Sequence, residues 1–245
     1  MFILISPFFT SGKAPKFTSP DETVNYYFAK LYAEKSELRL YEPLNPEVGG
    51  IIYPRNAFAE GDYILPGSFL GLPFYYGLTG KIFGNWIILF ITPFLAVLGA
   101  VFFYKLLKKI FPEKIAFLSA LLLFIQPVYW FYSAKGMWHN VPFLSLLMVG
   151  LYFLTKLAEK KPLDYFFSGL FLALALAFRS AEAVYAAPIL FVLVILFWHK
   201  ISKKYLLLGL FAGLLVFAPI FIIRRRFSET LLPPAILRKE WARLV

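Results

Sequence analysis

The sequence predicts an all-α membrane protein that crosses the bilayer several times, and three observations indicate this. Of its 245 residues, 60% are hydrophobic and only 16% are charged, with a mean hydropathy of +0.70. Soluble globular domains do not have this composition. Beyond residue 84, apolar segments follow one another, each near the ~20 residues that a membrane-crossing helix needs. Lysines gather in alternate connections between them, as membrane topology requires.

The net charge of +11 and the absence of cysteine narrow the function classes. A basic chain can bind nucleic acid, but in a chain this apolar, topology and anionic lipid explain the charge better, so no nucleic-acid partner is expected. Without cysteine, no disulfide, thiolate metal site or cysteine nucleophile exists. We expect no cofactor, because ligand spacing gives no support even to a divalent metal.

The two ends of the chain are predicted to be incomplete. Residues 1–9 contain the apolar run FILISPFF, which is too short to cross a bilayer and has no positive region before it. We interpret it as the outer end of a truncated first transmembrane helix. The basic tail, 224–245, ends without a stop-like feature, so the chain is expected to be partial.

Residues 10–84 form the one long polar segment and contain the only adjacent acidic pair, Asp21-Glu22. Ser19 before Pro20 is typical of a helix start, and Glu22 has the capping-box spacing from Ser19. The spacing of Val24, Phe28 and Leu31 predicts an amphipathic helix on the membrane surface. The acidic pair either serves only the helix terminus or leaves Asp21 free to face a site, and these readings are compatible.

The rest of this segment is predicted to be a loop followed by a second interfacial helix. Prolines and a Gly49-Gly50 pair punctuate residues 43–54, which indicates loop structure. Residues 66–84 are apolar and rich in glycine, and we expect a helix there that is broken at Pro73.

Six transmembrane helices are expected within residues 85–223. They are predicted at 86–107, 115–132, 141–157, 163–178, 184–198 and 205–223.

Charge alternates between the connections of these helices. Ten lysines lie in three of the connections, whereas the turns at 133–140 and 179–183 have only one basic residue each. The lysine-rich connections are 105–114, 156–164 and 199–204. Cytoplasmic loops carry the excess of Lys and Arg, so residues 10–84 are expected outside the cytoplasm. The three arginines at 224–226 break this rule. Either one span is wrongly assigned, or these arginines have an anionic partner.

Arg179 and His139 are further candidates at the same outer face. Arg179 ends an apolar helix. Placing an arginine at that depth costs free energy, so a function is expected for it, such as bidentate phosphate binding. It could equally snorkel to the headgroups or pair with Glu182. His139, at the mouth of a span beside Asn140, is either an interfacial side chain or a ligand.

These residues together resemble the GT-C type membrane glycosyltransferases, specifically the protein mannosyltransferase-like and aminoarabinose-transferase-like families. PDETVNYYFAKLY resembles the Asp-Glu motif in the first outer loop of those families. The runs LPGSFLGLP, HNVPFLSLLMVGLYFL and FFSGLFLALALAFRSAEAVYAAPILFVLV resemble the later part of that loop and the middle spans. The resemblance covers about residues 17–223. The family usually has an acid where His139-Asn140 falls, which is a departure.

The resemblance implies a GT-C-like bundle and sugar transfer, with inversion, from a polyprenyl-phosphate donor at the extracytoplasmic face of the plasma membrane. The acceptor is then a glycan, lipid or protein hydroxyl. Asp21 is the expected general base, and Glu22 orients it or only caps the helix. Basic residues at outer helix ends neutralise the leaving phosphate. The candidates for this role are Arg179, Arg224, Arg225 and His139.

Two other function classes stay open at this point. A transporter or flippase of lipid-linked sugars also needs outer arginines and an apolar groove, although transporters place polar groups near the midplane and carry inverted repeats. Neither feature is evident in the sequence. A non-catalytic membrane scaffold is the remaining alternative.

The predicted orientation can be tested by cysteine labelling, because the chain has no native cysteine. We expect an impermeant thiol reagent applied to intact cells to label Arg55→Cys and to leave Lys109→Cys unlabelled until the cells are opened. The reverse pattern would show that the lysine-rich connections lie outside.

Overall fold

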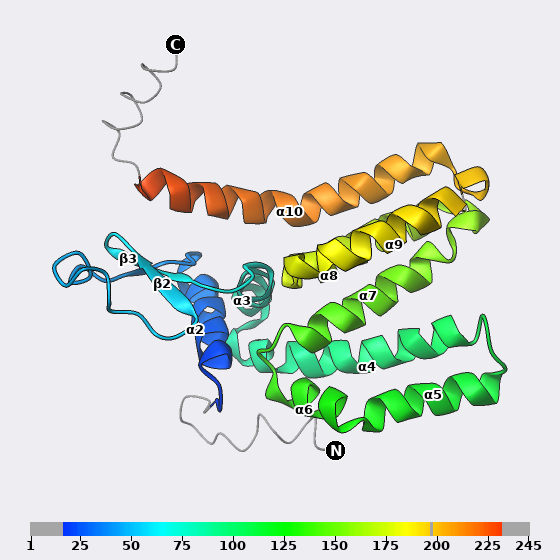
Figure 1. Cartoon of the computed structure of the whole chain (residues 1–245), viewed down its shortest axis with the longest axis horizontal. Helices are drawn as coiled ribbons and strands as arrows, with labels where there is room; N and C mark the ends of the chain where they lie inside the picture. Colours follow the sequence, from blue (N-terminus) through cyan, green and yellow to red (C-terminus); the bar gives the residue numbers. More distant parts are fainter. Residues whose placement is uncertain (1–16, 197, 232–245) are drawn as a thin grey trace, which may run out of the picture.

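The structure is a computed structural model that describes residues 17–196 and 198–231. It confirms the predicted fold class, a helical membrane bundle (Figure 1). In the bundle, α5 packs on α4, α4 on α7, α7 on α8 and α8 on α10. The helices are α4 (Ile88–Leu107), α5 (Glu113–Ile125), α6 (Pro127–Lys135), α7 (Asn140–Leu154), α8 (Pro162–Phe178), α9 (Ala183–Leu196) and α10 (Lys203–Leu231).

Three helical stretches of the described chain are long and apolar enough to cross a membrane alone. They are Asn85–Leu107, Asn140–Glu159 and Lys203–Phe227. Two bent helix pairs raise the number of spans to at most five by length and composition, against the six predicted. The difference lies in α8 and α9, with 17 and 14 residues, which are each short of the ~20 needed to span the hydrocarbon core.

Each bent pair is interrupted at a short break between its two helices. The expected span at 115–132 is broken into α5 and α6 with a bend of 58°. Pro127 begins α6, and a proline disfavours helical geometry in the residue before it, so Gln126 is extended (ψ 124°). Between α8 and α9 the chain turns by 116° at the Ser180–Glu182 turn, so α9 runs back along the bundle (Figure 1).

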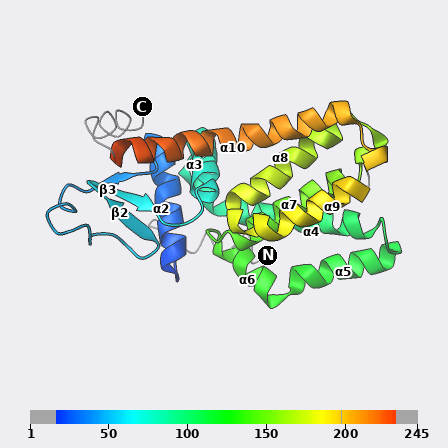
Figure 2. The same ribbon diagram turned by 45° about the horizontal axis from the view of Figure 1, so that its top comes forward.

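The lysine-rich connections gather at one end of the bundle. Both views place the α4–α5, α7–α8 and α9–α10 connections at this end, which we call the lysine end (Figures 1 and 2). The first segment, residues 17–84, lies at the opposite end, which we call the loop end. The predicted alternation of charge along the chain is therefore matched by the arrangement of the helices in space.

The first segment contains a small antiparallel sheet that our sequence analysis treated as loop. Its strands are β1 (Leu40–Tyr41), β2 (Ala57–Glu60) and β3 (Tyr63–Pro66), in the order β1-β3-β2. Glu60 pairs with Tyr63 across the two-residue turn Gly61-Asp62, where Gly61 has φ +55°. A Gly-Asp turn between apolar runs is a hairpin signal that could have been recognised.

The two helices of the first segment pack on protein. Ser19 caps α2 (Pro20–Lys35), and its Oγ accepts a hydrogen bond from the Asp21 amide at 3.2 Å, which confirms the predicted helix start. The face expected on lipid, Val24, Phe28 and Leu31, is instead buried in a cluster with the sheet and α3 (Gly71–Phe83). The expected break at Pro73 is wrong, because this proline lies in the first turn, where amides have no intrahelical partner.

The end of α10 leaves the bundle and covers the first segment (Figure 2). Ile220, Ile223 and Phe227 pack against the cluster that contains Val24 and Phe28. This contact explains how Arg224, Arg225 and Arg226 come to lie over the polar segment.

Small residues allow the helices of the bundle to approach closely. A Cβ at Gly169 of α8 would overlap the carbonyl oxygen of Gly209 of α10, and one at Gly99 of α4 would lie 2.5 Å from Ser145 Oγ. Such close approaches are typical of membrane helices, whose association depends on van der Waals packing rather than hydrophobicity.

We expect Gly169→Ala to destabilise the protein, since α8 and α10 must separate to admit the methyl group. The matched control is Gly213→Ala on α10, where the nearest atom to an added Cβ is 3.8 Å away. Alanine is favoured over glycine by about 1 kcal/mol in a helix, so the control should unfold at the same or a higher temperature. Thermal unfolding in detergent measures both, and equal midpoints would contradict the close contact.

Candidate functional site

A buried amide joins α2 to the bundle at the loop end. Asn25 Nδ2 donates to the Met137 carbonyl at 2.9 Å and lies 3.1 Å from His139 Nε2, while Asn25 Oδ1 accepts from Ser68 Oγ at 2.8 Å. Asn25 is fully buried. Sequence reasoning missed it, although Glu22, Asn25 and Ala29 have the spacing of one helix face.

The acidic pair is divided between two environments. Glu22 is fully buried, and among the described residues its carboxylate accepts a hydrogen bond from Thr18 Oγ1 at 3.5 Å. Asp21 is partly exposed. It lies one turn before Asn25, and residues four apart are neighbours on a helix surface. Asp21 is therefore the member of the pair that solvent or a ligand can reach.

His139 lies in the protein interior rather than on an open surface. Its exposed fraction is 8%, and its ring packs edge-on against Phe69, with centroids 5.5 Å apart. Because Asn25 presents an N–H to Nε2, that nitrogen acts as an acceptor and the imidazole is neutral. Burial, together with the nearby Arg179 charge, lowers the pKa of His139 to about 4.

Arg179 follows α8 and is held on two sides. One guanidinium nitrogen donates to Asn140 Oδ1, and another lies 2.8 Å from a Glu182 carboxylate oxygen. The expected pairing with Glu182 is thus present. Because Asn140 follows His139, the Asn25–His139 contact and the Asn140–Arg179 contact lie at neighbouring positions of the chain.

A cavity of about 640 Å³, which we call the main cavity, lies beside these polar residues. Ala177 and Ser180 contribute to its wall on either side of Arg179, and Ser68, the partner of Asn25, contributes another part. Asp21 and Arg179 themselves are not lining residues. The lining residues are Phe58, Glu60, Leu65, Pro66, Gly67, Ser68, Phe69, Leu70, Gly71, Ala177, Ser180, Phe217, Ile220, Phe221, Arg224 and Phe227.

The main cavity is amphiphilic. Its charged lining residues are Arg224, from α10, and Glu60, from β2, whereas most of the other lining residues are apolar and include five phenylalanines from the sheet, the 66–71 segment and α10. Gly71 packs directly against the backbone of α8, because it has no Cβ, and a Cβ there would overlap the Ala177 carbonyl oxygen. The cavity thus offers one guanidinium and one carboxyl group beside a largely apolar wall.

The three terminal arginines differ in position. All three are exposed, and of the three only Arg224 is among the residues that line the main cavity. Arg226 lies close enough to α2 to act on Tyr32, whose pKa is raised mainly by burial and lowered in part by the Arg226 charge. Of the three, Arg224 is therefore the one positioned to meet a ligand in the cavity.

Two other features bear on which ligands the protein could hold. A cavity of about 990 Å³ along α3 and α4 is lined by apolar residues apart from Thr79. Within residues 17–231, position 197 aside, no three His, Asp or Glu side chains converge as a metal site would require. The expectation that no cofactor is needed stays a prediction.

Comparison with known proteins identifies a family for most of the bundle. Residues 70–223, more than half of the chain, match the family model of dolichyl-phosphate-mannose-protein mannosyltransferases. The match includes Arg179 and begins after the acidic pair. Neither the search of curated proteins nor that of solved structures found a match.

The lowered pKa of His139, which precedes the span beginning at Asn140, predicts a pH-dependent stability. Between about pH 4 and 6.5 the unfolded chain binds a proton that the folded chain does not, so the free energy of unfolding rises with pH by up to about 3 kcal/mol. We expect His139→Asn to reduce the difference in melting temperature between pH 5 and pH 7.5. The control is His199→Asn, at the exposed other histidine. Equal pH dependence in wild type and His139→Asn would contradict the assignment.

Proposed function

Because the chain belongs to the dolichyl-phosphate-mannose-protein mannosyltransferase family of membrane glycosyltransferases, we propose that it transfers a sugar from a polyprenyl-phosphate donor to an acceptor hydroxyl. The acceptor is a glycan, a lipid or a protein, and the reaction takes place at the loop end, on the extracytoplasmic side. The observation that carries this proposal is the amphiphilic main cavity, with Arg224 at its wall.

In this proposal the main cavity binds the donor. The phenylalanines contact the first isoprene units of the lipid, and the Arg224 guanidinium binds the phosphate, which it can do in a bidentate manner. Arg179 does not line the cavity, but Ala177 and Ser180 of the same segment do. In this proposal the Arg179 guanidinium adds a second positive charge for the leaving phosphate. Arg225 contributes from the exposed side of α10. His139 supports Arg179 through the adjacent Asn140.

Asp21 is proposed as the general base. It takes the proton of the acceptor hydroxyl while the acceptor oxygen attacks the anomeric carbon from the face opposite the phosphate. The bond from that carbon to the phosphate oxygen breaks, and the polyprenyl phosphate leaves with the electron pair, so the configuration inverts. The exposure of Asp21 and its position one turn from Asn25, whose partner Ser68 lines the cavity, support this role. Glu22, which is buried, positions the start of α2.

We expect Asp21→Asn to reduce sugar transfer by about 10²–10⁴-fold, because the amide cannot accept the acceptor's proton. Transfer from a radiolabelled polyprenyl-phosphate sugar, in membranes that supply native acceptors and normalised to folded protein, measures this. Glu34→Gln is the matched control. It is the equivalent change of a carboxylate to an amide on the exposed part of α2, where Glu34 contacts Lys30 and Asn85 at the surface.

In the same assay, Arg224→Gln should raise the donor KM by about tenfold or more, because it removes a charge-assisted hydrogen bond. The increase should be larger than the one that Arg225→Gln causes. Asp21→Asn activity within a few-fold of wild type would remove Asp21 as the base. Movement of labelled donor across vesicles without sugar transfer would instead indicate the transporter class.

A further inference from the structure

A second, smaller cavity lies beside the β2–β3 hairpin, and we call it the hairpin cavity. Its volume is about 210 Å³, below the ~300–1,000 Å³ of pockets for drug-sized ligands, so it holds one small chemical unit. Its lining residues are Arg39, Glu60, Gly61, Asp62, Tyr63, Leu65 and Phe227. No residue of the predicted site is among them.

The walls of the hairpin cavity are held in place by the surrounding structure. β3, which carries Tyr63 and Leu65, is the central strand and pairs on both sides. The Asp62 carbonyl accepts a hydrogen bond from the Glu42 amide at 2.7 Å, which fixes the hairpin turn. The Arg39 guanidinium lies 4.6 Å from the centre of the Tyr63 ring, with Nε 3.8 Å from Glu37. The cavity is thus formed before any ligand binds.

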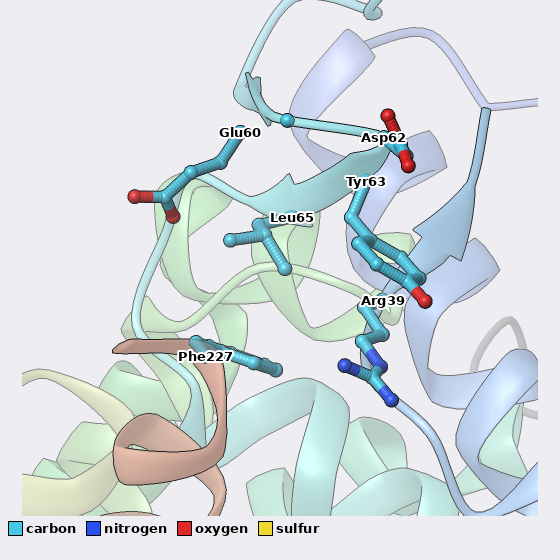
Figure 3. A pocket seen from close by; sticks show the side chains of 7 residues that line it. Arg39, Glu60, Asp62, Tyr63, Leu65 and Phe227 are labelled. Atoms are coloured by element: carbon cyan, nitrogen blue, oxygen red, sulfur yellow. The ribbon is translucent and has the colours of Figure 1, made fainter. Parts of the chain in front are cut away.

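The arrangement of its side chains combines both signs of charge with apolar surfaces. Figure 3 shows Arg39 beneath the Tyr63 ring and facing Phe227, with Leu65 between Arg39 and Glu60. Arg39 offers only hydrogen-bond donors, and ionised carboxylates offer only acceptors. Sugar hydroxyls can both donate and accept, and the C–H faces of a sugar ring suit Phe227 and Leu65. The lining contains two acidic residues and one arginine, so a neutral ligand is favoured over an anionic one.

The hairpin cavity adjoins the main cavity. Glu60, Leu65 and Phe227 line both, so they form a shared wall. Burial raises the pKa of Glu60 above its usual range. A ligand unit in the hairpin cavity would therefore lie next to whatever occupies the main cavity.

We propose that the hairpin cavity binds a neutral sugar unit of a glycan acceptor, one unit away from the sugar whose hydroxyl reacts. This inference rests on the proposed function, and it selects a glycan from the three acceptor classes. Binding energy from such a remote unit orients the reacting hydroxyl, which is how substrate parts distant from the chemistry assist a reaction.

The test is ligand binding to the full chain in phosphatidylcholine nanodiscs, which avoid detergents with sugar headgroups. Saturation-transfer NMR with methyl α-D-mannoside and methyl β-D-glucoside, without donor, should detect binding. We expect Arg39→Gln and Asp62→Asn each to reduce the signal by about threefold to tenfold, the usual cost of losing a hydrogen bond. Arg55→Gln, in the same segment but outside both cavities, is the matched control and should keep the wild-type signal.

Melting temperatures of the three variants establish whether each is folded. Because Arg39 and Asp62 are changed separately, one variant still tests the inference if the other does not fold. Equal signals in wild type, Arg39→Gln and Asp62→Asn would overturn the inference, as would stronger binding of methyl β-D-glucuronide than of the neutral glycosides. The measurement needs neither donor nor Asp21. Sugar binding in the hairpin cavity can therefore be absent while sugar transfer is established, and it can be present while sugar transfer is absent.

Discussion

The buried amide of Asn25 is the contact on which the arrangement of the loop end depends. Its two N–H groups and its carbonyl meet a backbone carbonyl, the His139 ring and Ser68, and these partners come from two distant parts of the chain. An unpaired buried amide costs about 1–3 kcal/mol for each lost partner, so α2, the 137–139 turn and the 66–71 segment must come together as a unit. The position of Asp21, one turn earlier, follows from this.

The bundle obeys a different constraint, because lipid offers its helices no hydrophobic reason to associate. Close contacts at Gly99, Gly150 and Gly169 bring backbones together instead. The charged groups divide between the two ends. At the lysine end, Lys105, Lys109 and Lys156 all lie near the Tyr152 ring. At the loop end, Arg39, Glu60, Asp62 and Arg224 line two adjoining cavities.

The long α10 helix connects these two parts. Its middle packs on α8, and its last turns place Arg224 and Phe227 over the sheet, so one helix contributes to both cavities. The three arginines that break the charge pattern in the sequence therefore lie beside an acidic, ligand-accessible segment. In the proposed function, this basic helix end over two adjoining cavities would provide a lipid phosphate and a sugar with separate binding places that share a wall.

The sequence by itself determined the helical membrane class, the alternation of lysine-rich connections and the start of α2 at Ser19, because composition, hydrophobic runs and capping residues are local properties. It also identified Arg179 and the acidic pair as unusual residues of the loop end. Only the tertiary structure decided that Glu22 is buried and Asp21 is not, that Asn25 joins α2 to His139, and that Arg224 rather than Arg225 lines the main cavity. The contact of Asn25 with His139 and the cavity that Arg224 shares with Glu60 each join positions more than a hundred residues apart, whose approach no local pattern encodes.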